Sequence, residues 1–149
     1  MIRPIYIING PNLNRLGTRE PDIYGHTTLA EVEALCRKVA GAHPVEFRQS
    51  NAEHEIIDWI HEAVDKGAGI IINPAGFSCT SIAIYDALNL FSGPVIELHI
   101  SNKDEEEGIY NRSLISKTAT AFIAGIGIAG YPLAVEAMSG LLEESNRLR

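Results

Sequence analysis

Ile5-Tyr6-Ile7-Ile8 leads directly into the stretch Asn9-Gly-Pro-Asn-Leu-Asn-Arg-Leu-Gly-Thr-Arg-Glu-Pro-Asp-Ile-Tyr-Gly25. The four apolar residues are typical of a buried parallel strand. The glycines and prolines of the longer segment exclude a helix, and its length exceeds what a connector needs. Its leucines, isoleucine and tyrosine argue against disorder, because disordered segments carry few such residues. We therefore predict that the first strand leads into an active-site lid loop over residues 10–27.

Helical and strand patterns alternate along the rest of the chain. Capping-box patterns at Thr28 and Ser50 begin two helices, which are expected to end near Gly41 and Gly67. Further strands are expected across residues 44–49, 69–73, 94–100 and 120–124, and further helices after Thr80 or Ser81 and after Pro132. This alternation implies a parallel sheet with right-handed crossovers. The sequence thus predicts one flavodoxin-like α/β domain over residues 1–149, with five strands in the order 2-1-3-4-5 and helices on both faces.

Composition limits the functions that the chain can have. The 149 residues carry a formal net charge of −7 and no cluster of Lys or Arg, which argues against binding nucleic acid. No apolar run approaches the roughly 20 residues needed to span a bilayer. The first residues do not resemble a signal peptide, and Cys36 and Cys79 suggest a reducing compartment. We expect a cytoplasmic protein that binds a small molecule and neither membranes nor nucleic acid.

Polar residues stand where three predicted strands end, at Asn9, at Asn73 and from Glu97 to Asn102. The predicted fold brings these ends together near the switch point, where ligands bind in such sheets. Glu97 and His99 are two residues apart on one strand, so their side chains share a face. One interpretation is a polar pair that only closes the strand end. The other is a histidine held by a carboxylate and poised for proton transfer.

Tyr24 in the lid loop also has two interpretations. It could be an aromatic anchor, or it could be a base activated by Arg19, five positions earlier in the same loop. A cationic neighbour lowers the pKa of a phenol from about 10 toward neutrality, which would let the tyrosinate form. The spacing alone does not decide between the two.

Other chemical motifs have weaker support. Gly125, Gly127 and Gly130 match the dinucleotide fingerprint, but they follow the last predicted strand, so tight backbone packing is expected instead. Cys79 precedes a helix, where it could form a nucleophilic set with His99 and Glu97, but no local signature supports that class of enzyme. The acidic run at residues 104–107 lacks the pattern of a metal site, so no metal is expected.

The chain resembles the type II 3-dehydroquinate dehydratases along nearly its whole length. The matching segments are Asn9-Gly-Pro-Asn-Leu-Asn, Gly17-Thr-Arg-Glu-Pro, Ile23-Tyr-Gly, Phe47-Arg-Gln-Ser-Asn, Ile57-Asp-Trp-Ile-His, Ile72-Asn-Pro, Thr80-Ser, Asp86-Ala-Leu and Pro94-Val-Ile-Glu-Leu-His-Ile-Ser-Asn. The resemblance implies a flavodoxin-like fold and a lyase (a hydro-lyase) that needs no cofactor. It also implies a homododecamer assembled from four trimers.

The resemblance further implies a mechanism, in which 3-dehydroquinate loses water by anti elimination through an enol or enolate to give 3-dehydroshikimate. Tyr24 matches the tyrosinate that removes a proton alpha to the ketone, and Arg19 matches its activator. Asn12 matches the asparagine that holds a water against the enolate. His99 matches the acid that protonates the departing hydroxyl, with Glu97 as its orienting group.

For substrate binding, the resemblance implies a carboxylate site and contacts to the ring hydroxyls. Asn73 and the backbone N–H groups of Ile100 and Ser101 match the carboxylate site. Asp86 matches an acidic residue that reaches the neighbouring subunit's site. The reaction belongs to the shikimate pathway, in aromatic amino acid biosynthesis or quinate catabolism.

Two departures from the family pattern concern the hydroxyl contacts. The family usually reads Asn-Pro-Gly-Ala-Tyr-Thr-His-Thr-Ser, whereas this chain has Cys79 in place of the histidine. The family also commonly reads Phe-Arg-His-His-Ser, whereas here Tyr110 takes the arginine's position and the arginine moves to Arg112. Lost polar partners can change substrate preference by orders of magnitude. A dehydratase of a related cyclic β-hydroxy ketone, or a binding homologue without catalysis, therefore stays an alternative.

Overall fold

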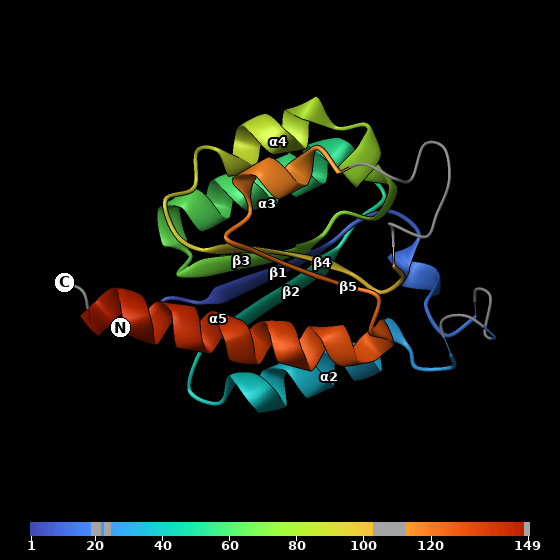
Figure 1. Ribbon diagram of the computed structural model, residues 1–149, viewed down its shortest axis with the longest axis horizontal. Coiled ribbons are helices and arrows are strands. Elements are labelled where there is room, and N and C mark those ends of the chain that lie inside the picture. Colours follow the sequence, from blue (N-terminus) through green and yellow to red (C-terminus); the bar gives the residue numbers. More distant parts are fainter. Residues whose placement is uncertain (19–21, 23–24, 103–112, 148–149) are drawn as a thin grey trace.

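A five-stranded parallel sheet organises the computed structural model, which describes residues 1–18, 22, 25–102 and 113–147. The strands lie in the order β2-β1-β3-β4-β5, which confirms the predicted flavodoxin-like topology (Figure 1). Their bounds are β1 (Ile5–Asn9), β2 (Val45–Gln49), β3 (Gly69–Asn73), β4 (Val95–His99) and β5 (Ala121–Ala124). The three central strands are buried at every position, as expected for strands covered on both faces.

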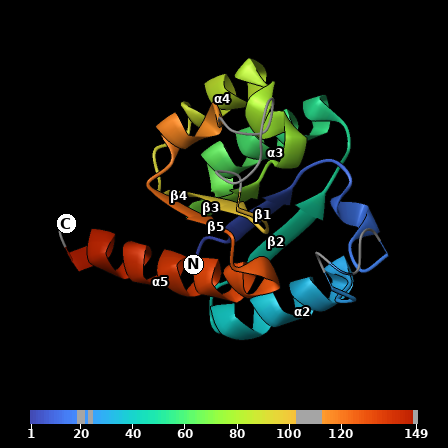
Figure 2. The same ribbon diagram turned by 45° about the vertical axis from the view of Figure 1, so that its right-hand side comes forward.

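Helices cover both faces of this sheet. One layer consists of α2 (Leu29–Ala40) and α5 (Gly130–Arg147), and the other of α3 (Glu53–Lys66) and α4 (Ile82–Leu88) (Figures 1 and 2). Short 3₁₀ helices join the main elements, namely η1 (Leu13–Arg15), η2 (Ala75–Cys79), η5 (Ile115–Thr118) and η6 (Gly127–Ala129). Among the helices in the described ranges, none has both the length and the apolar character needed to cross a membrane.

One of the two predicted capping boxes is present and the other is wrong. Thr28 caps α2, since its side chain accepts from the Glu31 N–H while Glu31 accepts from the Thr28 N–H. In contrast, Ala52 is the N-cap of α3 and makes no side-chain cap. Ser50 lies two residues earlier, where its hydroxyl accepts from the Ala52 N–H at 2.9 Å and donates to Glu55 at 2.6 Å. The serine therefore forms the turn before the helix instead of capping it.

Side chains of the strands alternate between two apolar cores. In β1, Ile5 and Ile7 pack in the core with α2 and α5, whereas Tyr6 and Ile8 pack in the core with α3 and α4. Cys36 is fully buried on α2, and burial raises the pKa of its thiol to about 12. Burying an isoleucine such as Ile5 or Ile7 stabilises the fold by roughly 1.5–3 kcal/mol before cavity and strain effects. This packing fixes which face each strand-end side chain occupies.

The glycine string after β5 has a packing role, as predicted. Gly125 and Gly127 have φ values of +88° and +68°, a backbone region that favours glycine. A Cβ on Gly130 would lie 2.7 Å from Leu98 Cδ1, so a larger residue would require the side chain of Leu98 to shift. Helix α5 begins at Gly130, two residues before the predicted start, and Pro132 lies within its first turn.

Candidate active site

The central feature of the site is a buried carboxylate–imidazole pair at the carboxyl end of β4. Glu97 is fully buried and His99 is 4 % exposed. Nε2 of His99 hydrogen-bonds to Oε2 of Glu97, which confirms that the two side chains share a face. Since Glu97 occupies Nε2, proton exchange between the imidazole and a ligand has to use the other ring nitrogen.

Two serines hold the carboxylate in place. Ser113 donates to Glu97 Oε2 at 2.7 Å, and Ser116 donates to Glu97 Oε1 at 2.7 Å. Burial alone would raise the pKa of the Glu97 carboxyl, but the hydrogen bonds from the histidine and both serines outweigh it and keep that pKa below its ordinary value. The lowered pKa favours the ionised form of Glu97 inside the protein.

The segment that carries these serines is anchored from two sides. Ile115, between them, is fully buried in the core under α3 and α4. The Leu114 N–H donates to the Ser78 carbonyl at 2.7 Å, which ties the segment to η2. On the β5 side, the ring of Phe122 lies 5.6 Å from the ring of His99. The imidazole thus has defined neighbours from β4 and β5.

A second polar cluster lies at the ends of β1 and β3. Asn9 and Asn73 are register partners at the last positions of these strands. The amide nitrogen of Asn73 donates to the Tyr131 hydroxyl at 3.0 Å, and that hydroxyl donates to Asn9 Oδ1 at 2.7 Å. Tyr131 belongs to α5, so these asparagines face the α2–α5 layer, whereas Glu97 faces the other layer.

Asn12 marks the start of the lid loop. Its backbone has φ 72° and ψ −6°, a left-handed conformation that asparagine tolerates better than most residues. Its N–H donates to Asn51 Oδ1 at 2.9 Å, and the side chain of Asn51 is in turn held by Gln49 at 3.1 Å. The backbone of Asn12 is therefore fixed from β2, while the residue itself stays exposed.

The described part of the lid loop is packed against the core. Leu13 and Leu16 are each 7 % exposed and contact the core between the sheet and the α2–α5 layer. This agrees with the prediction that the apolar residues of the loop order it, as far as residue 18. Four predicted site residues, Arg19, Tyr24, Tyr110 and Arg112, lie outside the described residues.

The remaining predicted binding residues lie around the same sheet edge, with one exception. Cys79 is half-buried in η2, and its Sγ lies 3.6 Å from the Ser78 hydroxyl. Ile100 is buried directly after His99, its carbonyl accepts from the Gly127 N–H at 3.0 Å, and Ser101 follows half-buried. Asp86 is exposed on α4, away from these strand ends.

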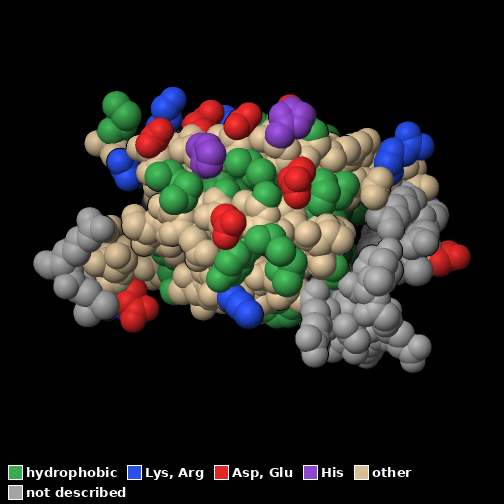
Figure 3. Space-filling model, turned by 90° about the horizontal axis from the view of Figure 1, so that it is seen from above, with side chains coloured by type: hydrophobic (Ala, Val, Ile, Leu, Met, Phe, Trp, Pro, Cys, Tyr) green, Lys and Arg blue, Asp and Glu red, His purple; other side chains and the backbone are tan. Residues whose placement is uncertain are grey.

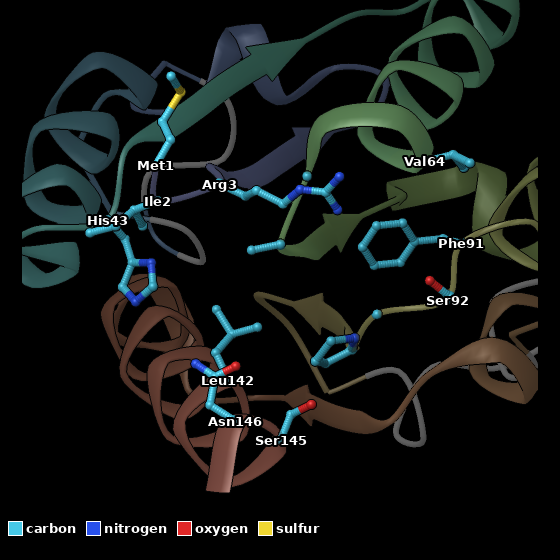
Figure 4. Close-up of a pocket in the computed structure, with 14 residues that line it drawn as sticks. Met1, Ile2, Arg3, His43, Val64, Phe91, Ser92, Leu142, Ser145 and Asn146 are labelled. Atoms are coloured by element: carbon cyan, nitrogen blue, oxygen red, sulfur yellow. The ribbon is translucent and has the colours of Figure 1, made fainter. Parts of the chain in front are cut away.

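A cavity of about 640 Å³ lies at the opposite end of the sheet from His99 (Figure 4). Ala68 and Pro94, which line it, immediately precede β3 and β4, so it is at the amino ends of the strands. Figure 4 shows Arg3, Phe91 and Leu142 around it. In the described ranges, no group of three His, Cys, Asp or Glu residues could hold a metal ion. The candidate active site is the polar edge at the carboxyl ends of the strands, because the buried Glu97–His99 pair lies there.

Comparisons with known proteins show the family to which the chain belongs. The family model described as "Dehydroquinase class II" matches residues 3–139. The 3-dehydroquinate dehydratase of Streptomyces avermitilis is 56 % identical over 143 residues, which cover 94 % of this chain and 90 % of that protein. The 3-dehydroquinate dehydratase 2 of Agrobacterium fabrum is 54 % identical over 142 residues, which cover 94 % of this chain and 97 % of that protein. The chain belongs to the class II dehydroquinase family.

Structural comparison extends the relationship to the fold. A crystal structure of the type II dehydroquinase from Propionibacterium acnes superimposes with a TM-score of 0.89 at 42 % identity, covering 94 % of this chain and 98 % of that chain. The resemblance to dehydroquinases inferred from the sequence motifs is thereby confirmed. The observed order of the strands, which the sequence predicted, also agrees with the dehydroquinase family.

Sequence reasoning missed three side chains of this dehydroquinase-family site, namely Ser113, Ser116 and Tyr131. Each reaches its partner across a long stretch of chain, which no local pattern reveals. One signal was available, because a buried carboxylate or amide at the end of a central strand requires polar partners. The sequence shows that Glu97, Asn9 and Asn73 need such partners, but not which residues supply them.

Proposed function

We propose that this chain dehydrates 3-dehydroquinate to 3-dehydroshikimate, as the names of its relatives state for those proteins. The reaction is an anti elimination: a proton leaves the carbon alpha to the ketone, and a protonated hydroxyl leaves as water. The reaction as proposed requires no cofactor. The observation that carries the proposal is the buried His99–Glu97 pair with its two serines, in a chain of the class II dehydroquinase family.

His99 is the proposed acid and Glu97 its positioning group. An ionised carboxylate beside the imidazole stabilises the imidazolium, which is the form that can give a proton to the leaving hydroxyl. Ser113 and Ser116 fix both carboxylate oxygens, so the imidazole is held in one orientation before substrate binds. After water leaves, the imidazole regains its proton from solvent.

The lid loop supplies the other half of the proposed machinery. Tyr24 is the proposed base and Arg19 the cation that favours its phenolate form. Asn12 is proposed to hold a water that donates to the enolate oxygen, a small oxyanion hole. The fixed backbone of Asn12 supports this role, because a preorganised donor costs no reorganisation during the reaction.

The substrate carboxylate is proposed to bind at Asn73 and at the N–H groups of Ile100 and Ser101. Cys79 and the Tyr110–Arg112 segment are proposed to surround the ring hydroxyls, with Arg112 reaching in from its shifted position. Supporting this, Cys79 lies in η2, which begins two residues after Asn73. A thiol in place of a histidine offers only a weak donor and acceptor, so less hydroxyl recognition comes from that position.

We also propose assembly into a homododecamer built from trimers, in which Asp86 contributes to a neighbouring subunit's site. In support, Asp86 is exposed on α4 between Ile82 and Leu90, which are 65 % and 60 % exposed. Figure 3 shows hydrophobic and acidic side chains side by side on the face seen from above. Light scattering coupled to size exclusion tests this proposal, and a monomer at micromolar concentration would contradict it. The thiols of Cys36 and Cys79 support the cytoplasm as the proposed compartment.

The activity test is direct, because the product is a conjugated enone and the substrate is not. Purified protein is added to 3-dehydroquinate, and the absorbance of the enone is followed in the near ultraviolet. The proposal predicts a steady rise with kcat/KM above about 10⁴ M⁻¹s⁻¹, the low end of working enzymes. No rise, with a folded protein and a relative's enzyme active in the same assay, would contradict it.

A further inference from the structure

Tyr131 joins the ends of the two strands from which the proposed active-site loops begin. Its side chain is 1 % exposed, and its hydroxyl lies between Asn9 at the end of β1 and Asn73 at the end of β3. These residues are 122 and 58 positions away from Tyr131 in the chain. The lid loop begins directly after Asn9, and η2 follows Asn73, so both loops start at this contact.

The hydrogen bonds of this network have a single consistent direction. Oδ1 of Asn73 accepts from the Ala75 N–H at 3.2 Å, which puts the amide nitrogen of Asn73 on the side of Tyr131. The tyrosine hydroxyl must then accept from Asn73 and give its own proton to Asn9 Oδ1. The amide nitrogen of Asn9 donates to the Arg48 carbonyl at 3.1 Å, which agrees with this order.

Two further features accompany this network. Burial raises the pKa of the Tyr131 hydroxyl, so the hydroxyl keeps its proton and remains a donor. The backbone beyond the asparagines is also tightly packed. The Gly10 N–H donates to the Asn73 carbonyl at 2.8 Å, and a Cβ on Gly10 would lie 2.5 Å from the Pro74 carbonyl oxygen. The ends of β1 and β3 are therefore held close together.

We infer that Tyr131 is a positioning residue for the substrate carboxylate, because it fixes the side-chain amide of Asn73 with its nitrogen available as a donor. An amide nitrogen carries two hydrogens, and Tyr131 takes one of them. The second is the donor assigned to the carboxylate, and a 180° rotation of the amide would present an oxygen to an anion instead. This inference rests on the proposed function, in which Asn73 binds the carboxylate.

Tyr131→Phe removes only the hydroxyl, and the chain provides a matched control. Tyr6 is also 1 % exposed, and its hydroxyl donates to Glu62 at 2.7 Å, but it faces the other core. Tyr131→Phe is expected to raise KM for 3-dehydroquinate at least about tenfold, the effect of losing a hydrogen bond to a charged group, with a smaller change in kcat. Tyr6→Phe is expected to leave KM unchanged.

A double-mutant cycle with Asn73→Ala separates positioning from a general structural effect. If Tyr131 acts through Asn73, then Tyr131→Phe adds little to the raised KM of Asn73→Ala. Additive effects of the two substitutions, or equal KM values in Tyr131→Phe and Tyr6→Phe, would overturn the inference. Inactive wild-type protein would instead count against the proposed function.

A measurement that does not depend on turnover distinguishes failure of this inference from failure of the proposed function. The side-chain amide signals of Asn73 in a ¹⁵N NMR spectrum are expected to shift in Tyr131→Phe and not in Tyr6→Phe. Unchanged signals in Tyr131→Phe would overturn the inference whatever the activity. If Tyr131→Phe does not fold, neutron diffraction of the unsubstituted protein serves instead. The hydroxyl proton of Tyr131 has to point to Asn9 Oδ1, and a proton directed at Asn73 would overturn the inference.

Discussion

Replacing Ser116 by alanine tests the claim that Glu97 is held as a buried carboxylate. Ser116 makes the 2.7 Å hydrogen bond to Oε1, while His99 and Ser113 both contact Oε2. The substitution therefore removes the partner of one carboxylate oxygen and leaves the other oxygen's partners in place. Because Glu97 is fully buried, solvent does not screen this bond.

The expected loss of stability depends on pH. A hydrogen bond to a charged group contributes about 1.5–3 kcal/mol, and one between neutral groups about 0.5–1.5 kcal/mol. The pKa of Glu97 is lower in the folded protein than in the unfolded chain, so its ionisation stabilises the fold above the unfolded pKa of about 4.3. That stability is lost as pH falls through the folded pKa. Ser116→Ala is thus expected to lower the free energy of unfolding by about 1.5–3 kcal/mol at pH 7. Below the folded pKa of Glu97 the loss is expected to be about half as large.

Urea unfolding at fixed protein concentration, at pH 7 and in steps down to a pH below the folded pKa of Glu97, measures this difference. Ser139→Ala is the matched control, because the Ser139 hydroxyl donates to the neutral carbonyl of Val135 at 3.1 Å. The loss of unfolding free energy in Ser139→Ala should not change with pH. If the costs of Ser116→Ala and Ser139→Ala stay parallel across this range, the hydrogen bond does not serve an ionised Glu97 and the reasoning is refuted.

Three further substitutions test other parts of the account. Tyr24→Phe is expected to lower kcat in the enone assay by at least about 10²-fold, because proton abstraction needs the phenolate. Its circular dichroism spectrum should be unchanged, and unchanged turnover would remove Tyr24 from the mechanism. Cys79→Ser is expected to keep kcat within a few-fold, and complete inactivation of this variant would support a nucleophilic cysteine. Thr28→Ala is expected to lower unfolding free energy by about 1 kcal/mol, because it removes the cap of α2, and an unchanged urea midpoint would contradict that role.

The sequence predicted the sheet well because its central strands are apolar and sharply bounded. Strand β3, Gly69–Asn73, has the predicted limits, since a glycine starts it and an asparagine ends its run of isoleucines. Helix ends were harder to predict. The start of α5 depends on the packing of Gly130 against Leu98, and the failed cap at Ser50 depends on a turn. Both are decided by tertiary contacts that local patterns do not contain.

For the site, the sequence predicted the groups that share one element and missed the groups that join elements. Alternation along a strand was enough to place Glu97 beside His99. The serines that hold the carboxylate come from the segment 16 and 19 positions later, and their positions depend on the buried anchor Ile115. No sequence pattern indicated the role of Tyr131, because its two partners lie on other elements.

Proton exchange in heavy water tests most directly whether His99 is the acid of the elimination. His99→Ala is incubated with 3-dehydroquinate in D₂O, and proton NMR follows the hydrogen alpha to the ketone together with the vinyl proton of the product. The account predicts that the alpha hydrogen exchanges for deuterium while formation of product falls by about 10²–10⁴-fold, the usual contribution of a general acid. Product formation at the wild-type rate would contradict it.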